Sequence, residues 1–587
     1  MNLQNRKSNY DKFPHVEIKN FENEVWRDYK NIVTELNKKI ESFEKGKNII
    51  ILDEYHGVDK LEIRTNLIDK LNVDEIILSE DAKYSEEKIF NMLEKNISDD
   101  RVFGVLSTHT LEDFFDKTKL EILKEKVKSS SSKTILIYGI GASLIAKGDV
   151  VIYADMARWE IQQRFRKGNV GNWGVENFSE DILKRYKRSY FIEWRVFDRH
   201  KKSIFDKVDY LLDTNKKNDP KLITGNAFRV GLKESASRPF RVVPFFDPGI
   251  WGGQWMKEVC DLDKSKENYA WCFDCVPEEN SLNLKYGDTV VEIPSIDLVL
   301  KHPRELLGEK VHARFGAEFP IRFDFLDTMD GQHLSLQVHP LTEYIQEKFG
   351  MHYTQDESYY MLDTGEDACV YLGTKENIDP SEMIKDLEKA QKGSTFLDKK
   401  YINNFPAKKH DHFLIPAGTI HCSGQNSMVL EISSTPYIFT FKLWDWGRLG
   451  LDGIPRPIHL NHGKNVIQFD RTTKWVEENL INRIESIDSG DGWREERTGL
   501  HEREFIETRR HWFTKRVSHN TDGNLNVLNL VEGEEAIIES PTNNFEPYIV
   551  HYAETFIIPA SVGEYTIRPY GKSEGKEIAT MKAYVRF

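Results

Sequence analysis

Cysteine is scarce in this sequence, and so are long apolar segments. The 587 residues include five cysteines, too few and too irregularly spaced for a disulfide framework, which favours a reducing compartment. No apolar run approaches the ~20 residues that a membrane-spanning helix needs, and the polar residues 1–6 open no secretory signal. We therefore expect a cytoplasmic protein with no membrane partner.

Blocks of one charge are also absent. The net charge is −14, but acidic and basic residues are interspersed along the chain. Nothing in this pattern indicates a surface for nucleic acid. At about 100–200 residues per domain, the length excludes a single domain and predicts three or four. The sequence gives no indication of the oligomeric state.

Residues 1–213 alternate apolar strand patterns with helical patterns. We predict strands at 48–53, 74–78, 102–106, 134–138 and 150–153, and helices at 84–93, 111–127 and 157–167. Strands and helices in alternation predict a doubly wound α/β domain. The polar, turn-rich residues 214–239 are predicted to be a linker to the next domain.

This first domain resembles a degenerate P-loop nucleoside kinase. The resemblance implies a phosphate loop around Gly57 and Lys60, but such a loop needs a second glycine and a hydroxyl residue. Asp59 and Leu61 stand at those two positions, so we predict no nucleotide-binding residues. On the helix that follows the last strand, we favour a solvated basic face over a remnant phosphate lid. Its basic residues are Arg158, Arg164, Arg166 and Lys167.

From residue 240 onward, short alternating strands are separated by turn signals, a pattern typical of a double-sheet jelly roll or barrel. We place one such domain at 240–480, with a helical insertion near 376–410, and a second at 481–587. Within the second, Phe556–Ala560 echoes Phe413–Ala417, but only the earlier copy is followed by a histidine, His421. The second roll is therefore predicted to be free of metal and structural.

Four side chains in the first roll predict a metal site. Gln337 and His339 alternate on one strand and so share a face. Glu357 and His421 lie in strand-like surroundings further along. Two imidazoles, a carboxylate and an amide oxygen fit catalytic zinc, or another divalent ion, better than a closed structural site. The Cys272-x-x-Cys275 pair lacks a second pair and is predicted to be two ordinary thiols.

The same segments resemble class I mannose-6-phosphate isomerase. The matching motifs are Leu334–Pro340, the Glu357 segment, Ile415–His421 with Leu430–Ile432, and Ile250–Gly253. The resemblance implies a cupin fold and one zinc ion per chain, held by Gln337, His339, Glu357 and His421. It also implies interconversion of mannose 6-phosphate and fructose 6-phosphate by proton transfer through a cis-enediolate.

Further residues take roles from this resemblance. Lys442 stands where the family has an arginine, and Arg448 closes the same strand, so both are predicted to be catalytic. Ser335 keeps a phosphate-side hydroxyl, and Trp251 is predicted to line the substrate site. Lysine cannot reproduce the bidentate contact of arginine, although it binds phosphate as a point charge.

Two departures leave the substrate open. Gln355 and Asp324 stand where the family has lysines, and each lost charged contact to a phosphate costs about 1.5–3 kcal/mol. Arg322 would compensate only if a regular strand places it on the face of Asp324. Two alternatives follow: an isomerase of an unphosphorylated sugar, and a metal-dependent sugar sensor without turnover.

Overall fold

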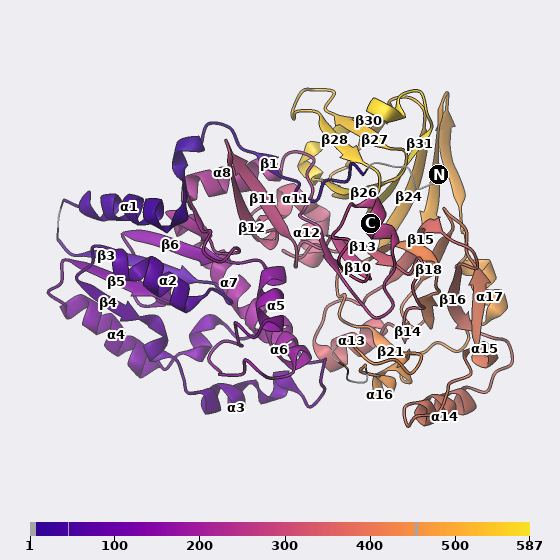
Figure 1. Cartoon of the computed structure of the whole chain (residues 1–587), viewed down its shortest axis with the longest axis horizontal. Helices are drawn as coiled ribbons and strands as arrows, with labels where there is room; N and C mark the ends of the chain where they lie inside the picture. The colour runs from indigo at the N-terminus through magenta and orange to yellow at the C-terminus, as the bar shows by residue number, and fades with distance from the viewer. Residues whose placement is uncertain (1–7, 45, 452, 454–455) are drawn as a thin grey trace. The chain divides into compact units, whose positions relative to one another are not determined.

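The computed structural model describes residues 8–44, 46–451, 453 and 456–587 (Figure 1). The chain forms two compact units. We call His15–Ser235 with Pro277–His302 the α/β unit; the β unit comprises Ala236–Val276, Pro303–Phe587 and the described residues up to Pro14. The expectation of a multidomain protein is thus confirmed.

No helix in the described part of the chain has both the length and the apolar character needed to cross a membrane.

A seven-stranded sheet in the order β2-β8-β7-β6-β3-β5-β4 forms the centre of the α/β unit. The five strands from β7 to β4 are parallel, whereas β8 runs antiparallel to β7. The apolar run of β3 is almost wholly buried, as expected of a parallel strand covered on both faces. The strands are β2 (Val25–Arg27), β3 (Asn48–Glu54), β4 (Glu75–Leu78), β5 (Thr134–Tyr138), β6 (Val150–Asp155), β7 (Tyr210–Asp213) and β8 (Lys221–Thr224).

Helices connect these strands, and their bounds agree with most of the predicted helical segments. They are α1 (Asp28–Glu41), α2 (Lys60–Asn66), α3 (Glu86–Ile97), α4 (Lys117–Ser129), α5 (Arg158–Arg166), α6 (Ile182–Arg188), α7 (Trp194–Ile204) and α8 (Gly225–Ser235). The predicted strand at 102–106 is wrong. This segment and the residue after it instead form hydrogen bonds with helical residues. Val105 N donates to Asn96 O, and Ser107 N donates to Phe191 O, both at 2.8 Å.

Residues 214–239 are not a linker. They contain β8, which pairs with β7 at the end of the sheet, and α8. The polar residues around 215–220 form only a turn, whereas Leu222, Ile223 and Phe228 are fully buried. The polar turn has the composition of a linker, but the short apolar strand after it belongs to the sheet.

Residues Pro277–His302 return to the α/β unit, contrary to the prediction of one domain over 240–480. They form β11 (Ser281–Tyr286), β12 (Thr289–Pro294) and α10 (Ile296–Lys301), and β11 pairs with β1 (Val16–Glu17). Asp297 on α10 accepts a hydrogen bond from the buried Lys201 at 2.9 Å, while Asp155 accepts another at 2.7 Å. β12 therefore falls within the range predicted for the first roll but belongs to this unit.

The β unit contains two pairs of antiparallel sheets. In the first pair, the six-stranded sheet has the order β18-β15-β20-β13-β10-β9 and the five-stranded sheet β17-β16-β19-β14-β21. These strands are β9 (Phe245–Asp247), β10 (Trp271–Cys275), β13 (Ile321–Asp327), β14 (Leu336–Val338), β15 (Glu357–Thr364), β16 (Cys369–Thr374), β17 (Ile402–Pro406), β18 (His412–Ile415), β19 (His421–Ser423), β20 (Ser427–Ser434) and β21 (Phe441–Trp444).

Helices accompany the first pair of sheets. The predicted insertion contains α14 (Pro380–Ala390), where Asp379 caps the first turn by accepting from Ser381 N at 2.8 Å, and α15 (Asp398–Tyr401). The others are α9 (Trp255–Val259), α11 (Pro303–Leu307), α12 (Glu309–Phe315), α13 (Thr342–Phe349), α16 (Leu460–Gly463) and α17 (Thr473–Asn479).

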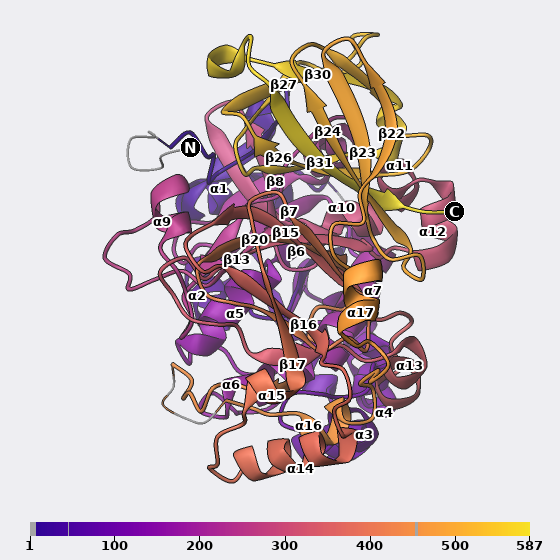
Figure 2. The same cartoon turned by 90° about the vertical axis from the view of Figure 1, so that its right-hand side faces the viewer.

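The second pair of sheets lies at the top of Figure 2, with orders β22-β23-β24-β31-β26-β29 and β25-β30-β27-β28. Between them lies an apolar core that includes Phe513, Leu528 and Phe556. The strands are β22 (Glu485–Gly490), β23 (Trp493–Gly499), β24 (Ile506–Phe513), β25 (Val517–Asn520), β26 (Asn526–Glu532), β27 (Glu535–Glu539), β28 (Tyr548–His551), β29 (Thr555–Ile558), β30 (Glu564–Pro569) and β31 (Ile578–Val585).

Candidate metal centre

The predicted ligands come from both sheets of the first pair. Gln337 on β14 pairs in register with His421 on β19, and His339 follows at the end of β14. Glu357 is the first residue of β15 in the other sheet. The turn before His421 depends on Gly418: its φ is +89°, and a Cβ there would lie 2.7 Å from Cγ of Gln468. Strand order and this turn bring the histidines to one place.

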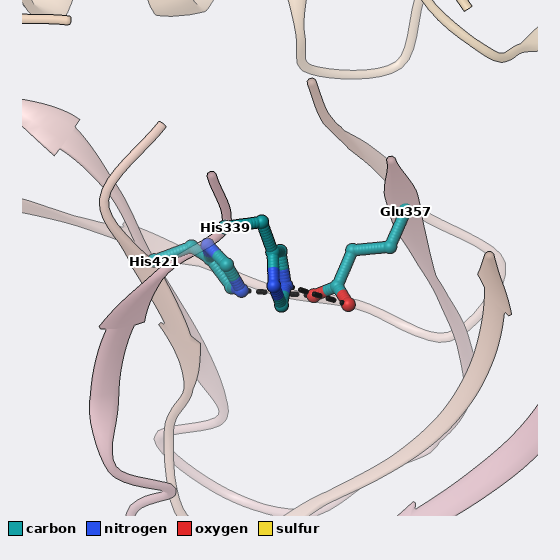
Figure 3. Close-up of side chains that lie close together, drawn as sticks. All are labelled: His339, Glu357 and His421. Atoms are coloured by element: carbon teal, nitrogen blue, oxygen red, sulfur yellow. Dashed lines mark ion pairs between the residues drawn. The ribbon is translucent and has the colours of Figure 1, made fainter. Parts of the chain in front are cut away.

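Three of the four side chains converge. The imidazoles of His339 and His421 point at the carboxylate of Glu357, which comes from the other sheet (Figure 3). His339 Nε2 lies 3.0 Å from Glu357 Oε2, and His421 Nε2 lies 2.8 Å from Oε1. All three side chains are completely buried, and their ligand atoms lie within 4.8 Å of one another.

The outer nitrogens of both imidazoles are already engaged. Nδ1 of His339 donates to Phe439 O at 3.0 Å, and Nδ1 of His421 donates to Thr419 O at 2.9 Å. Such bonds fix the tautomer and turn the Nε2 lone pair inward. His339 Nε2 and Glu357 Oε1 are buried without a well-formed hydrogen bond in the described structure. A divalent cation would satisfy these atoms, so the donor set fits a metal ion.

Two glutamines border the cluster. The side-chain nitrogen of Gln337 lies 3.2 Å from His421 Nε2, and a half-turn of the amide would present its oxygen instead. Gln355 is buried and its Nε2 donates to Glu357 Oε2 at 3.2 Å. Gln355 therefore positions the carboxylate, a role that its place in the sequence did not reveal.

The charges in the site are mutually compensated. Burial opposes ionisation of Glu357, but the two imidazoles hold its pKa well below the usual range. Burial likewise disfavours protonated His339, yet the Glu357 charge raises the pKa of that imidazole. Glu431 on β20 is also buried, and burial together with the Glu357 charge raises its pKa to about 7. An acid with a pKa near neutrality is suited to proton transfer.

Arg322 does not supply the cation missing at Asp324. The register of β13 is regular, so the two side chains share a face. Arg322 Nε lies 2.9 Å from Asp324 Oδ2 and donates to Ser433 Oγ at 3.0 Å, and its Nη2 binds Glu431. Only 5% of the Arg322 side chain is exposed, and its guanidinium forms ion pairs with Asp324 and Glu431.

A second cationic group surrounds Ser335. The Ser335 hydroxyl donates to Asp445 Oδ1 at 2.9 Å. Arg448 Nη2 lies 2.5 Å from the same oxygen, and Arg456 Nη1 lies 3.0 Å both from Ser335 Oγ and from Asp445 Oδ2. Arg448 and Arg456 thus share the Asp445 carboxylate, next to Ser335, which directly precedes β14. Arg456 was not predicted, because it lies in a loop with no periodic pattern.

The remaining predicted residues lie in different surroundings. Lys442 is opposite Gln337 in the β14–β21 register and is half-buried. Trp251 is buried against Trp271, with ring centroids 5.5 Å apart. Within the described residues, neither the hydrogen bonds of Trp251 nor its ring contacts involve the four predicted ligands. Cys272 and Cys275 are buried thiols on β10.

The predicted solvated basic face in the α/β unit is wrong for two of its four residues. Arg158 is 2% exposed and forms an ion pair with Asp198. Arg164 is also buried and donates to Gly57 O at 2.9 Å and to Thr214 O at 2.8 Å. Arg158 thus joins α5 to α7, and Arg164 holds the segments that follow β3 and β7.

Comparisons with known proteins give two kinds of match, one to a family model and one to curated proteins. Residues 28–237 match a family described as a domain of unknown function, DUF8485. The chain is 26% identical over 240 residues to "Mannose-6-phosphate isomerase ManA" of Bacillus subtilis, covering 40% of this chain and 69% of that protein. It is 22% identical over 333 residues to "Probable mannose-6-phosphate isomerase GmuF" of the same organism, covering 56% and 96%.

Part of the chain is thus homologous to mannose-6-phosphate isomerases, at low identity. Among solved structures, the mannose 6-phosphate isomerase from Bacillus subtilis aligns with a TM-score of 0.48 and 19% identity, covering 59% of this chain and 99% of that one. A putative mannosephosphate isomerase from Archaeoglobus fulgidus aligns with a TM-score of 0.45 and 18% identity, covering 60% and 98%.

Proposed function

We propose that the β unit is a metal-dependent aldose–ketose isomerase that interconverts mannose 6-phosphate and fructose 6-phosphate. The observation that carries this proposal is the buried convergence of His339, Glu357 and His421, with donor atoms left for a cation. These residues and Gln337 would hold one divalent metal ion, zinc in our assignment. When bound, the ion supplies a Lewis acid for the carbonyl and hydroxyl oxygens of a sugar.

Ser335, Arg448 and Arg456 are proposed to bind the phosphate. Asp445 offsets only one of the two guanidiniums, and a phosphate would gain charge-assisted hydrogen bonds from both. Ser335 directly precedes β14, two residues before Gln337, which supports a phosphate site next to the proposed metal ligands. Arg448, which the sequence assigned to catalysis, is thus reassigned to substrate binding.

Proton transfer between the first two sugar carbons needs a base. We assign this role to the Glu431 carboxylate, which takes the proton from one carbon and returns it to the next through a cis-enediolate of the sugar. Glu431 lies on β20, which pairs with β15 so that Tyr359 is opposite Glu431 and Glu357 opposite Ser433, and burial raises the pKa of this carboxyl. Lys442, opposite Gln337 in register, is proposed to stabilise the negative charge that develops on the sugar oxygens.

The decisive experiment is a substrate panel on full-length protein that has been loaded with zinc and on protein that has been stripped by a chelator. Proton NMR should show mannose 6-phosphate converting to fructose 6-phosphate in the loaded sample only, at about one bound ion per chain. Turnover at the same rate in stripped protein with no detectable metal would refute the metal dependence.

A second candidate keeps the reaction but changes the substrate. Gln355 and Asp324 provide no positive charge where the resembling family has lysines, which favours an unphosphorylated aldose. Faster conversion of free mannose than of mannose 6-phosphate in the panel would select this candidate. Binding of sugar without conversion of any aldose would leave the sensor function.

A further inference from the structure

A cavity of about 620 Å³ lies at the carboxyl ends of the parallel strands in the α/β unit. The end of β3 and the loop that leads to α2 form its floor, residues after β4 and β5 form one wall, and the loop between α5 and α6 forms the other. Ligands of open α/β sheets bind at this edge, and the volume is typical of small-molecule sites.

The α5–α6 loop is fixed over the cavity by one buried carboxylate. Glu193 accepts hydrogen bonds from Trp173 N at 3.0 Å, Asn172 Nδ2 at 2.8 Å and Arg188 Nε at 2.9 Å. The Trp173 indole in turn donates to Glu80 Oε1 on the opposite wall at 3.1 Å. Hydrogen bonds to Glu193 and Glu80 thus hold Trp173 in the wall of the cavity.

Glu54, the last residue of β3, is the exceptional group in this cavity. Its neighbour Asp53 accepts from Gly141 N at 2.9 Å, Ser143 Oγ at 2.6 Å and His200 Nε2 at 2.9 Å. Glu54 is also buried, at 3% exposure against 0% for Asp53, yet its carboxylate has no hydrogen bond or ion pair with any residue that the structure describes. Burial of an unpaired carboxylate is costly unless a partner arrives.

The lining charges determine which partner fits. Five carboxyl groups line the cavity, against two ammonium groups, and the ammonium of Lys60 is already paired with Glu80. The acidic residues are Glu54, Asp59, Glu80, Glu86 and Glu176, and the basic ones are Lys60 and Lys83. A polyphosphate would be repelled, whereas a cation would be attracted.

We propose that this cavity binds a small organic cation through an ion pair between its ammonium group and the Glu54 carboxylate. The apolar part of the ligand would lie against the Trp173 wall, and a second amine would meet the remaining carboxylates. This inference concerns the α/β unit alone and does not depend on the isomerase proposal.

Proton release accompanies such binding. Burial raises the pKa of the free Glu54 carboxyl to about 8, with Lys60 opposing and Glu80 adding to the shift. A bound ammonium favours the ionised form. At pH 7 the complex should therefore release a proton from Glu54, which calorimetry detects as a dependence of the binding heat on the ionisation enthalpy of the buffer.

The test is titration of the full chain with 1,4-diaminobutane, its neutral analogue 1,4-butanediol, and ATP, in two buffers that contain no primary amine. We expect the diamine alone to bind, with proton release. In the Glu54→Gln variant the affinity should fall at least tenfold and the release should disappear. Glu94→Gln removes the same charge from an exposed site on α3 outside the cavity and should bind like the wild type.

The proposal is overturned if the diamine binds wild type no better than Glu54→Gln, which includes no binding to either. It is also overturned if Glu94→Gln loses affinity equally, since that would indicate attraction by net charge alone. Binding of ATP instead of the diamine would overturn the proposal and indicate that the cavity is a nucleotide site.

Discussion

Glu357 and Glu54 are buried carboxylates at the end of a strand, one in each unit, but their surroundings differ. Two imidazoles and an amide contact Glu357, and its pKa is held well below the usual range despite burial. Glu54 has no such contacts, and burial raises its pKa to about 8. Burial alone therefore does not determine whether an acid is ionised; the partner groups do.

The largest effect is expected from removing one of the partners of Glu357. His421→Ala deletes a proposed ligand, and the loss should exceed the 10–100-fold cost of changing a supporting residue. We expect metal affinity and turnover to fall by roughly a thousandfold, measured by elemental analysis and sugar NMR. His412→Ala, equally buried on β18 but outside the cluster, should retain its metal if folded. Full activity of metal-free His421→Ala would contradict the assignment.

Glu54→Gln tests the carboxylate without partners, through the pH dependence of the free energy of unfolding. The folded pKa of about 8 lies above the unfolded value of 4.5, so between these values the native state binds more protons and wild-type stability falls as pH rises. Glutamine removes this slope. Relative to wild type, the variant should gain about 3 kcal/mol between pH 5 and pH 8 in urea unfolding of the α/β unit. If the unfolding free energies of the two proteins changed in parallel with pH, the pKa of Glu54 would not be raised in the folded state.

Arg456→Ala extends the comparison to a third carboxylate, Asp445, which forms ion pairs with two guanidiniums, those of Arg448 and Arg456. Loss of a charged contact of about 1.5–3 kcal/mol should raise the KM for mannose 6-phosphate by about 10–100-fold, without a comparable change for free mannose. Arg494→Ala, on the exposed surface of the second roll, is the control. An equal loss with both sugars would assign Arg456 a structural role.

The smallest effect concerns the hydrogen bond from Gln355 to Glu357. Gln355→Leu keeps approximate volume but removes the donor, and loss of such a supporting contact should weaken metal binding about tenfold. Competition with a chelator of known affinity measures this change. Unaltered affinity would mean that the two imidazoles alone orient the carboxylate.

Local patterns predicted much of the fold and pointed to three side chains that the structure brings together, His339, Glu357 and His421. Alternation placed Gln337 and His339 on one face, and continuous apolar runs located β3, β5 and β6. Prediction failed where the outcome depends on contacts distant in sequence. The membership of β11 and β12 in the α/β unit was not predicted, because it depends on the pairing of β11 with β1. Likewise, neither the capture of Arg322 by Glu431 nor the approach of Arg456 to Ser335 has a local signature.

The return of Pro277–His302 to the α/β unit has a consequence for dissecting the molecule. The polypeptide enters that unit at His15, leaves after Ser235, and comes back before passing on again, so no single cut separates the two units. A fragment ending at Ser235 would lack Asp297 and leave Lys201 in a dry interior with Asp155 as its remaining carboxylate partner. A recombinant α/β unit would therefore need residues 277–302 joined to Ser235 through a designed connection.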